Sequence, residues 1–570
     1  MGYELFELFL QTFNFVVIIS NMEHKFTNLQ QMLQHNLKNY ATKDSYGFAG
    51  KKAITYQEYH NKVASYAALL ASYGIQKEDK VALLSPNSPQ WCMGYYSAIY
   101  LGAIVVPLLN EFSEHEIDNI LEHSETKAIF VSQRFFEKHK DVLQKYPLVV
   151  DVDTLEVYKA DNAPVEKQLK MYFSKPDDIA VIIYTSGTTG KSKGVMLTHK
   201  NLISQLKQLF ILQPVHSYDV YLSVLPLSHV LEASLCFLYS IMRGASIYFL
   251  RKPPTASVLL PALKQVRPSI MLTVPLIIEK IFNSKVYPEL TKTPLLRTLY
   301  SIPFMRKVMH KKACAQLMET FGGRIRFFGI GGAKLDKTVE RFLLEGGFPY
   351  AIGYGLTETA PLLAGANPSM VRLQSTGPAV EGVTLKINNP DPRTGEGEIW
   401  AKGDNVMKGY YKEPELTKEV LTEDGWFKTG DIGFIDKKNI LFIKSRLKNV
   451  IISSNGENIY PEDIESVINS FKGVLESIVV EKKGKLVALV NFNIDEMEKQ
   501  YEQLKENVSN RVDEIKDELD TRVEKLKSEL VEYVNSRVSK SSKIAYVIHI
   551  KAEFDKTPTS KIKRYKYAFV

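Results

Sequence analysis

The sequence is poor in cysteine and has no long uninterrupted apolar run. Only three of the 570 residues are cysteine, and Cys92, Cys236 and Cys314 lie far apart in the chain. Without close Cys or His spacing, neither a disulfide framework nor a zinc site is predicted, and this cysteine usage is typical of a reducing compartment. The apolar segment 13–19 is too short to span a bilayer, and it lacks the basic start of a signal peptide.

The sequence also has no strong excess of charge of one sign. It contains 72 Lys and Arg residues against 64 Asp and Glu residues, a net charge of +8 that we expect to be spread along the chain. A modest, spread charge does not indicate a nucleic-acid partner. The apolar content of 45% is ordinary for a globular protein, and the length favours two or more domains. We therefore expect a cytoplasmic globular protein.

The first residues of the chain are rich in apolar side chains. A polar segment begins at Met22, and we expect this residue to be the natural start and residues 1–21 to be an added extension. The alternative is that residues 1–21 form a short interfacial anchor. In that case the protein would contact the inner face of the membrane peripherally.

Strand-like and helix-like segments alternate over residues 55–135. Apolar runs at 81–84, 103–106 and 128–131 predict buried strands, and the segments 89–101 and 114–123 between them predict helices. The alternation resumes with the runs at 179–183, 245–249, 270–274 and 325–330. This pattern predicts an α/β fold in which a large N-terminal domain, residues 22–443, contains parallel sheets.

The composition changes after residue 376, where Gly, Pro and charged residues become frequent. We expect a β-rich subdomain over 376–443, a hinge at 444–448 and a small, mobile α+β domain over 449–570. Within the small domain, apolar residues recur about every 3.7 positions over 494–540, which predicts a long helical insertion. Its 13 acidic and 9 basic residues argue against a basic membrane helix. A structural role is preferred, and a partner-binding arm is the alternative.

Residues 184–194 combine hydroxyls, glycines and lysines directly after the apolar run 179–183. Such a segment predicts a strand followed by a flexible loop whose N–H groups and side chains bind a polyphosphate. It is not a Walker A loop, because Thr185 stands where the first glycine is required. A solvated turn without a ligand is the alternative.

Further segments offer groups that suit a nucleotide. Tyr354 could stack on a base, Thr357 could bond a phosphate, and Glu358 offers hard oxygen to Mg²⁺. Asp431 could accept ribose hydroxyls, and Arg446 could pair with phosphate or ribose. The glycines at 329–334 and 353–358 do not form a dinucleotide fingerprint, because the third glycine is missing in both.

Together, and in this order, these motifs resemble the adenylate-forming superfamily of acyl-CoA synthetases, nonribosomal-peptide adenylation domains and luciferases. The resemblance runs from about residue 26 to residue 570. The segments that carry it are 184–194, 225–230, 353–359, 426–433, and 446–465 together with Lys561.

The resemblance implies a role for each matching residue. The phosphate loop would consist of Thr185, Ser186, Gly187, Thr188, Thr189, Gly190 and Lys193. The adenine and the α-phosphate would contact Gly331, Gly332, Ala333, Tyr354, Gly355 and Thr357. Asp431 and Arg446 would bind the ribose, and Glu358 with Thr185 would hold the metal. Lys561 would act in catalysis with Thr357 and Glu358, Lys448 would be the hinge, His229 would lie near the acyl pocket, and Ser454 and Gly456 would lie in the CoA region.

The implied reaction uses ATP and Mg²⁺ to turn a fatty acid into an acyl-adenylate, which then reacts with CoA. The segment 558–564 and the helical insertion resemble those of bacterial long-chain acyl-CoA synthetases. The sequence departs from the superfamily's pattern at Ser192, where Pro is usual, and at Ser560, where Gly is frequent. Two alternatives are an acyl carrier protein as the acceptor and a non-catalytic acyl-binding scaffold.

Overall fold

The computed structural model describes residues 26–186, 192–452, 458–471, 473–482, 484–493, 512–557 and 562–567. The predictions for residues 1–21 and for the first part of the helical insertion therefore lie outside the described residues. The chain divides into two compact units. Unit 1 comprises residues 1–386, 400–428 and 437–441, and unit 2 comprises residues 387–399, 429–436 and 442–570. Among the described helices, none is long and apolar enough to cross a membrane.

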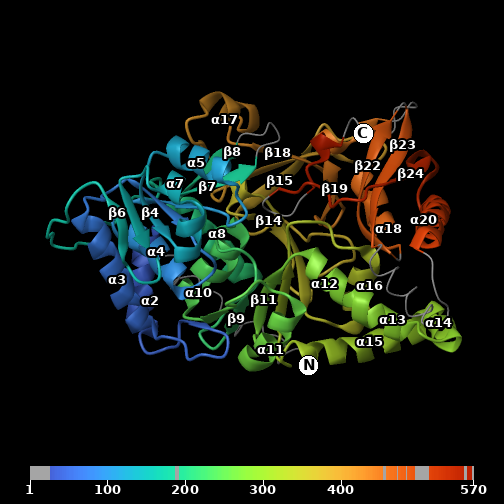
Figure 1. The fold of residues 1–570 in the computed structure, drawn as a ribbon, viewed down its shortest axis with the longest axis horizontal. Helices are drawn as coiled ribbons and strands as arrows, with labels where there is room; N and C mark the ends of the chain where they lie inside the picture. Colours follow the sequence, from blue (N-terminus) through green and yellow to red (C-terminus); the bar gives the residue numbers. More distant parts are fainter. Residues whose placement is uncertain are drawn as a thin grey trace, which may run out of the picture. The chain divides into compact units, whose positions relative to one another are not determined.

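One sheet of unit 1 has eight strands in the order β17-β8-β7-β3-β2-β4-β5-β6. Figure 1 labels four of them, β8, β7, β4 and β6. The five central strands β7, β3, β2, β4 and β5 are parallel to their neighbours, whereas β8, β17 and β6 are antiparallel additions. The strands are β2 (Lys80–Leu84), β3 (Ile104–Pro107), β4 (Thr126–Val131), β5 (Leu148–Asp151), β6 (Val157–Ala160), β7 (Ile179–Ser186), β8 (Ser192–Thr198) and β17 (Gly409–Tyr410).

The second sheet of unit 1 has seven strands in the order β1-β10-β9-β11-β12-β13-β14. All neighbours are parallel except the pair β13 and β14. The strands are β1 (Tyr46–Phe48), β9 (Val220–Ser223), β10 (Ser246–Phe249), β11 (Ile270–Thr273), β12 (Phe327–Ile330), β13 (Tyr350–Gly355) and β14 (Leu362–Gly365). The strands predicted from the apolar runs are confirmed to within two residues at their ends, except that β7 continues three residues beyond Ile183, and the α/β class is confirmed as well.

Helices fill the connections between these strands. Capping boxes begin α3 at Thr55 and α5 at Ser113, where a glutamate three residues later bonds back to the cap backbone. The first helices are α2 (Leu29–Tyr40), α3 (Tyr56–Ser72), α4 (Pro89–Tyr100), α5 (Glu114–His123), α6 (Gln133–Lys138), α7 (Lys140–Leu143), α8 (His199–Leu212), α9 (Val230–Glu232), η1 (Ala233–Leu238), α10 (Tyr239–Arg243) and α11 (Ala256–Val266). The later ones are α12 (Pro275–Ile281), η2 (Phe282–Val286), α13 (Tyr287–Leu290), α14 (Pro294–Ser301), α15 (Pro303–Thr320), α16 (Lys337–Gly346), η3 (Thr357–Thr359) and α17 (Pro414–Val420).

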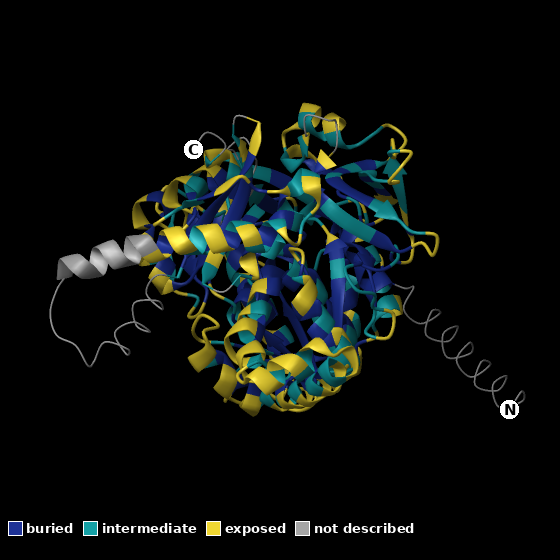
Figure 2. Cartoon of the chain, turned by 90° about the vertical axis from the view of Figure 1, so that its right-hand side faces the viewer, coloured by how far each residue is buried: buried dark blue, intermediate teal, exposed yellow. Residues whose placement is uncertain are grey.

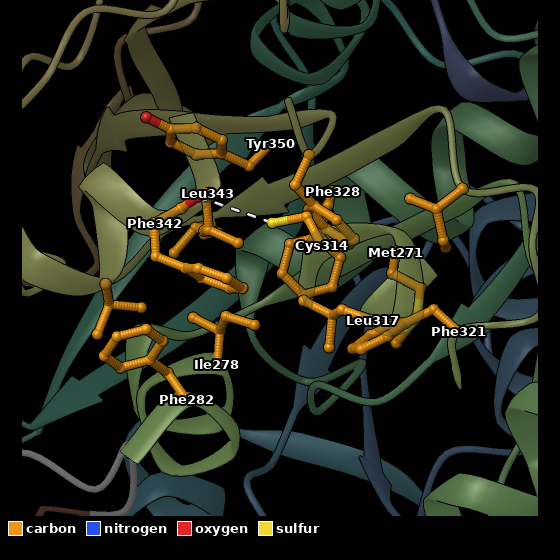
Figure 3. Close-up of a cluster of buried hydrophobic side chains, with 14 of the residues drawn as sticks. Met271, Ile278, Phe282, Cys314, Leu317, Phe321, Phe328, Phe342, Leu343 and Tyr350 are labelled. Atoms are coloured by element: carbon orange, nitrogen blue, oxygen red, sulfur yellow. Dashed lines mark hydrogen bonds between the residues drawn. The ribbon is translucent and has the colours of Figure 1, made fainter. Parts of the chain in front are cut away.

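A buried apolar cluster fixes α12, α15 and α16 to the seven-stranded sheet (Figure 3). Phe282, Phe342 and Leu343 meet Cys314 and Leu317 within this cluster, and each of these five side chains is at most 5% exposed. Burying so many large side chains stabilises the unit by roughly 1.5–3 kcal/mol for each of them. The carboxyl ends of β11, β12 and β13 are thereby held on a packed layer of helices.

A four-stranded sheet, β15 (Val383–Asn388), β16 (Gly397–Gly403), β18 (Phe427–Ile435) and β19 (Leu441–Arg446), follows in the region predicted to be β-rich. Unit 2 continues with a three-stranded sheet in the order β22-β23-β24. Its further elements are η4 (Leu447–Asn449), β20 (Ile451–Ile452), β21 (Asn458–Ile459), α18 (Pro461–Asn469), β22 (Val474–Lys482), β23 (Lys485–Phe492), α20 (Val512–Asn535), η5 (Lys540–Ser542), β24 (Tyr546–His549) and η6 (Arg564–Lys566).

One local prediction is wrong. The segment after Ile183 was expected to be a flexible loop, but β7 continues to Ser186 and β8 begins at Ser192, with Thr185 paired to Lys193. Tyr and Thr favour extended backbone when a partner strand is available, and β8 supplies that partner. Both Thr185 and Lys193 are therefore strand residues of a hairpin.

Candidate functional site

The candidate site of unit 1 lies at the carboxyl ends of four neighbouring parallel strands. In the order β9, β11, β12, β13 these strands end at Ser223, Thr273, Ile330 and Gly355. Three predicted segments follow directly: the loop with His229 after β9, the turn 331–333 after β12 and the turn 356–358 after β13. Ligands of open α/β sheets bind at this edge. The structure therefore brings together segments that are up to about 130 residues apart in sequence.

The turn after β12 exposes backbone next to β11 and β13. Gly331 N–H donates to the carbonyl of Thr273 at 3.1 Å, and Gly332 has a φ of +86°, a conformation that favours glycine. A Cβ on Gly331 would meet no atom closer than 3.6 Å. Close packing within the protein therefore does not require glycine at position 331, since a Cβ there would make only ordinary van der Waals contacts.

The turn after β13 is tightly constrained. A Cβ on Gly355 would lie 1.8 Å from the carbonyl oxygen of Pro361, so only glycine fits there. Leu356 N–H donates to Thr359 Oγ1 at 3.0 Å, and Asn405 donates to the carbonyl of Thr359 at 2.8 Å. The short helix η3 is thus fixed on both sides and presents Thr357 and Glu358, which are both half-buried.

Glu358 and Lys193 meet on opposite parts of one tyrosine. Tyr410 donates its hydroxyl to Glu358 Oε1 at 2.8 Å, and Lys193 Nζ lies 5.3 Å from the centre of the Tyr410 ring. Tyr410 belongs to β17, which pairs with β8 opposite Val195. The hairpin of Thr185 and Lys193 and the carboxylate of Glu358 are therefore parts of one arrangement. Tyr410 was missed by the sequence reasoning.

The residues around Glu358 fit a magnesium ion bound together with phosphate. Glu358, Thr185 and Thr357 offer only oxygen atoms, which Mg²⁺ prefers. No group of three or more His, Cys, Asp or Glu side chains that could hold a metal occurs in the described part of the chain. One carboxylate with hydroxyl oxygens fits a Mg²⁺ ion whose other ligands are water and substrate phosphates, because Mg²⁺ is usually held by one or two carboxylates in such sites.

His229 lies in the loop after β9 and has a capping role in the structure. Its Nδ1 accepts the N–H of Leu231 at 3.2 Å, at the start of α9. Asn87 holds the same loop: it accepts from Leu227 N–H at 2.8 Å and donates to the carbonyl of Leu225 at 2.6 Å. The loop is rigidly placed at the sheet edge, and the proximity of His229 to an acyl group remains a prediction.

Glu232, three residues further on, is a buried acid that the sequence reasoning missed. Its side chain is 1% exposed, and burial raises the pKa to about 8 despite hydrogen bonds with Ser223 and Cys236. Its Oε2 has no hydrogen-bond partner in the described structure. Glu232 is therefore largely protonated and neutral at pH 7.

In unit 2, Asp431 and Arg446 form an ion pair. Arg446 Nε lies 2.7 Å from Asp431 Oδ1, and Asp431 is only 4% exposed. The two residues lie on β18 and β19, which are adjacent in their sheet. A Cβ on Gly433 would lie 2.4 Å from the carbonyl oxygen of Phe442, so glycine is needed for these strands to approach. The structure thus brings together the two residues predicted to act on the ribose.

Lys448 is exposed on η4, and its neighbours are fixed on both sides. Ser445 Oγ donates to Glu462 Oε2 at 2.6 Å, and Asn449 Nδ2 donates to Glu462 Oε1 at 2.6 Å. Glu462 is in the first turn of α18. One carboxylate therefore connects both flanks of the predicted hinge residue to the same helix.

Lys561, Ser454, Gly456 and the loop residues Gly187, Thr188, Thr189 and Gly190 lie outside the described residues. Described residues on both sides of Lys561 make defined contacts. Lys556 and Ile562 form an antiparallel bridge, and Arg564 makes an ion pair with Glu465 of α18.

The fold and this arrangement of groups define an adenylate-forming enzyme. The chain belongs to the AMP-binding enzyme family, whose sequence profile matches residues 33–411. Among its relatives, the long-chain-fatty-acid–CoA ligase heimdall of Drosophila melanogaster is 30% identical over 474 residues, covering 74% of this chain and 68% of the relative. The long-chain-fatty-acid–[acyl-carrier-protein] ligase AEE15 of Arabidopsis thaliana is 28% identical over 555 residues, covering 80% and 75%. The 4-coumarate–CoA ligase 2 of Nicotiana tabacum is 31% identical over 468 residues, covering 76% and 78%.

Solved structures of similar fold extend over nearly the whole chain. An ATP-bound RpMatB-BxBclM chimera, B1, aligns with a TM-score of 0.74 at 26% identity and covers 95% of this chain and 99% of its own. The O-succinylbenzoate coenzyme A synthetase MenE of Bacillus subtilis, in complex with ATP and magnesium ion, aligns with a TM-score of 0.73 at 24% identity, covering 94% and 98%. The class of activity that these findings support is an adenylate-forming ligase of acyl or aryl acids.

Proposed function

We propose that this protein uses ATP to activate a fatty acid as an acyl-adenylate and then transfers the acyl group to CoA. The products would be acyl-CoA, AMP and pyrophosphate. The observation that carries the proposal is the meeting of the Thr185–Lys193 hairpin with Glu358 at Tyr410, in a chain of the AMP-binding enzyme family.

The phosphates would be bound by the hairpin. Lys193 and the hydroxyl of Thr185 would bind the β- and γ-phosphates, and Ser186, Gly187, Thr188, Thr189 and Gly190 would complete this loop. Glu358, with Thr185, would hold Mg²⁺, which supplies charge neutralisation for the phosphates. Thr357 would donate to the α-phosphate.

The nucleoside would be recognised by separate groups. In unit 1, Tyr354 and the turn from Gly331 to Ala333 would frame the adenine, and this role is supported by the lack of a packing contact that requires glycine at position 331. In unit 2, Asp431 would accept the ribose hydroxyls, while the ion pair with Arg446 orients its carboxylate.

In the first step, a carboxylate oxygen of the acid forms a bond to the α-phosphorus, and the bond from that phosphorus to the β-phosphate oxygen breaks. Negative charge grows on the leaving pyrophosphate and on the α-phosphate oxygens. Lys561 and Thr357 would stabilise this charge. In the second step, the CoA thiolate attacks the acyl carbon and AMP leaves. We propose that the small domain rotates about Lys448 between the two steps, so that Lys561 leaves the acyl-adenylate. Ser454 and Gly456 would then lie near CoA.

A long-chain fatty acid is the preferred substrate. The similarity to the Drosophila long-chain-fatty-acid–CoA ligase supports this choice, as does the resemblance of the segment 558–564 to long-chain synthetases. The similar level of identity to 4-coumarate–CoA ligases makes an aryl acid the main competitor. The Arabidopsis relative that is an acyl-carrier-protein ligase favours a second candidate acceptor, a carrier protein in place of CoA.

The experiment is a panel of acids offered with ATP and Mg²⁺, in which thioester formation is measured with CoA and with acyl carrier protein. Saturated fatty acids of six to twenty carbons and 4-coumarate form the panel. We expect the highest kcat/KM for a long-chain acid with CoA. A preference for 4-coumarate would contradict the proposed acid, and thioester formation only on the carrier protein would contradict the proposed acceptor.

A further inference from the structure

The consecutive helices α12 to α15 carry a concentration of exposed apolar side chains. Among the described residues, 18 large apolar side chains are exposed, and six of these lie within residues 276–308. They are Leu276 at 63%, Tyr287 at 42%, Leu295 at 69%, Ile302 at 45%, Phe304 at 74% and Val308 at 47% exposed. We refer to these six residues, with the basic residues among them, as the α12–α15 face. Figure 2 shows these helices largely in yellow, in the lower part of the view.

The same helices hold most of the excess positive charge of the chain. Residues 275–312 contain eight Lys or Arg and two Glu, a net charge of +6, compared with +8 for all 570 residues. The basic residues are Lys280, Lys285, Lys292, Arg297, Arg306, Lys307, Lys311 and Lys312. Lys292 pairs with Glu289 and Arg306 pairs with Glu345, while Lys280, Lys285, Lys307, Lys311 and Lys312 are exposed.

Apolar and basic side chains are interleaved on α15. Phe304, Lys307, Val308 and Lys311 are separated by three, one and three residues, so they lie along one side of the helix. All four are exposed. Phe304 and Val308 thus lie beside two lysines, and these are the two kinds of side chain with which a protein contacts a membrane interface.

The inner sides of α12 and α15 are packed through buried side chains, whereas no residue of α13 or α14 is buried. Tyr300 lies 5.8 Å from the Tyr287 ring and 5.4 Å from the His310 ring, measured between ring centres. Arg306 binds Glu345 of α16 through two contacts of 2.8 and 3.0 Å. Cys314 and Leu317 of α15 belong to the apolar cluster of Figure 3. The parts of the α12–α15 face that lie on α12 and α15 are therefore held in place by packing.

We propose that the α12–α15 face docks on the surface of an anionic lipid bilayer. Phe304, Leu295 and Ile302 enter the boundary between headgroups and acyl chains, and the lysines contact lipid phosphates. Lys and Arg residues close to an anionic membrane surface are attracted to it, and this face exposes five lysines. The charge also argues against a second copy of this chain as the occupant, because two faces of net charge +6 would repel each other. Lysine is moreover depleted at the cores of protein interfaces.

The docking face is connected to the candidate site. α12 begins at Pro275, two residues after the end of β11, and Glu279 of α12 accepts the N–H of Asp336, just after the turn 331–333, at 2.9 Å. An amphiphilic acid partitions into the lipid beneath such a face. The proposal of membrane docking is independent of the proposed reaction, and its test measures vesicle binding and not catalysis.

The test compares binding of the full chain to phosphatidylcholine vesicles with and without phosphatidylglycerol. The double variant Leu295→Glu with Phe304→Glu removes two of the most exposed apolar side chains. The matched control is Val165→Glu with Ile211→Glu, where both residues are 60% exposed and lie in unit 1 away from this face in sequence. We expect the double variant to lose at least about tenfold in partition coefficient on anionic vesicles, and the control pair to bind like the unaltered chain. Thermal unfolding confirms that both variants fold.

A second readout reports contact directly. The three native cysteines are buried, so an environment-sensitive fluorophore can be attached at Phe304→Cys or, as a control, at Ile211→Cys. We expect the emission to shift to shorter wavelength with anionic vesicles only for the label at position 304. Equal shifts at both positions, or undiminished vesicle binding of the double glutamate variant, would overturn the proposal. So would a change of oligomeric state in that variant without a change in vesicle binding, because the face would then be a protein interface.

Discussion

At the scale of single residues, the packing of the protein requires glycine at one position of the candidate site and not at another. Gly355 is required by the protein itself, because a Cβ there would lie 1.8 Å from the carbonyl oxygen of Pro361. Gly331 has no such neighbour within 3.6 Å. If a nucleotide binds as proposed, the reason for Gly331 is the approach of the adenine rather than the packing of the protein.

The replacement Gly331→Ala is therefore expected to leave the thermal unfolding temperature unchanged and to raise the KM for ATP about tenfold, the equivalent of about 1.4 kcal/mol. Gly355→Ala serves as the comparison and should destabilise the fold by about 3 kcal/mol or more. An unchanged KM for ATP in Gly331→Ala would contradict the proposal that the adenine binds beside this turn.

Glu232 makes the stability of the fold depend on pH. Burial raises the pKa to about 8, from 4.5 in the unfolded chain. Between these two values the folded state keeps a proton that the unfolded state has released, so the free energy of unfolding falls as pH rises. For this one group the slope approaches about 1.4 kcal/mol per pH unit.

Glu232→Gln removes this dependence, since the amide cannot ionise. We expect the unfolding temperature of the variant, relative to that of the unaltered protein, to increase from pH 5 to pH 8. Thermal unfolding of both proteins across this range provides the measurement. Two curves that stay parallel would show that Glu232 does not titrate with a raised pKa.

At the scale of elements, three segments from distant parts of the chain meet at Tyr410. β17 contributes the tyrosine, β8 contributes Lys193, and η3 contributes Glu358. The tyrosine hydroxyl fixes the direction of the carboxylate that would hold the metal. Partners of this kind typically account for a 10- to 100-fold effect on metal affinity or activity.

Tyr410→Phe keeps the ring beside Lys193 and removes the hydroxyl that donates to Glu358. The Mg²⁺ concentration that gives half-maximal adenylation should then rise about tenfold or more. Tyr411→Phe is the matched control, because Tyr411 donates to Glu125 at 3.0 Å and not to Glu358. An equal effect of both substitutions would indicate a general disturbance of β17 rather than a role at Glu358.

The strands and helices of the parallel sheets could be predicted from the sequence because short apolar runs alternate with amphipathic segments. The hairpin of residues 179–198 could not, because its threonines and glycines are equally typical of a loop and only pairing with β8 decides between the two. Tyr410 gave no local signal at all. Its contact with Glu358 joins residues 52 positions apart, and the pairing of β17 with β8 spans more than 200 positions.

At the scale of the whole molecule, the nucleotide-binding motifs could be predicted from the sequence because their order along the chain resembles that of the adenylate-forming superfamily. The basic face on α12–α15 was missed because a net charge of +8 was taken as evenly spread, whereas +6 of it falls within 38 residues. Glu232 was missed because no local sequence pattern showed that this carboxyl is buried, as it is in the structure.

The two half-reactions should depend on different parts of the molecule. Lys561→Ala is expected to reduce adenylation by at least about a hundredfold, because the variant lacks the positive charge that would stabilise the negative charge growing on the phosphates. The same variant should still transfer the acyl group from supplied acyl-adenylate to CoA at close to the normal rate. Single-turnover assays of each step separate the two, and an equal loss in both would contradict the role assigned to Lys561.

The central claim is that this protein forms an acyl-adenylate, and the exchange of labelled pyrophosphate into ATP tests it most directly. In the absence of CoA, we predict exchange that requires Mg²⁺ and a fatty acid, and that falls sharply in Glu358→Gln. No exchange with any fatty acid of six to twenty carbons or with 4-coumarate, or cleavage of ATP to ADP and phosphate, would contradict the account.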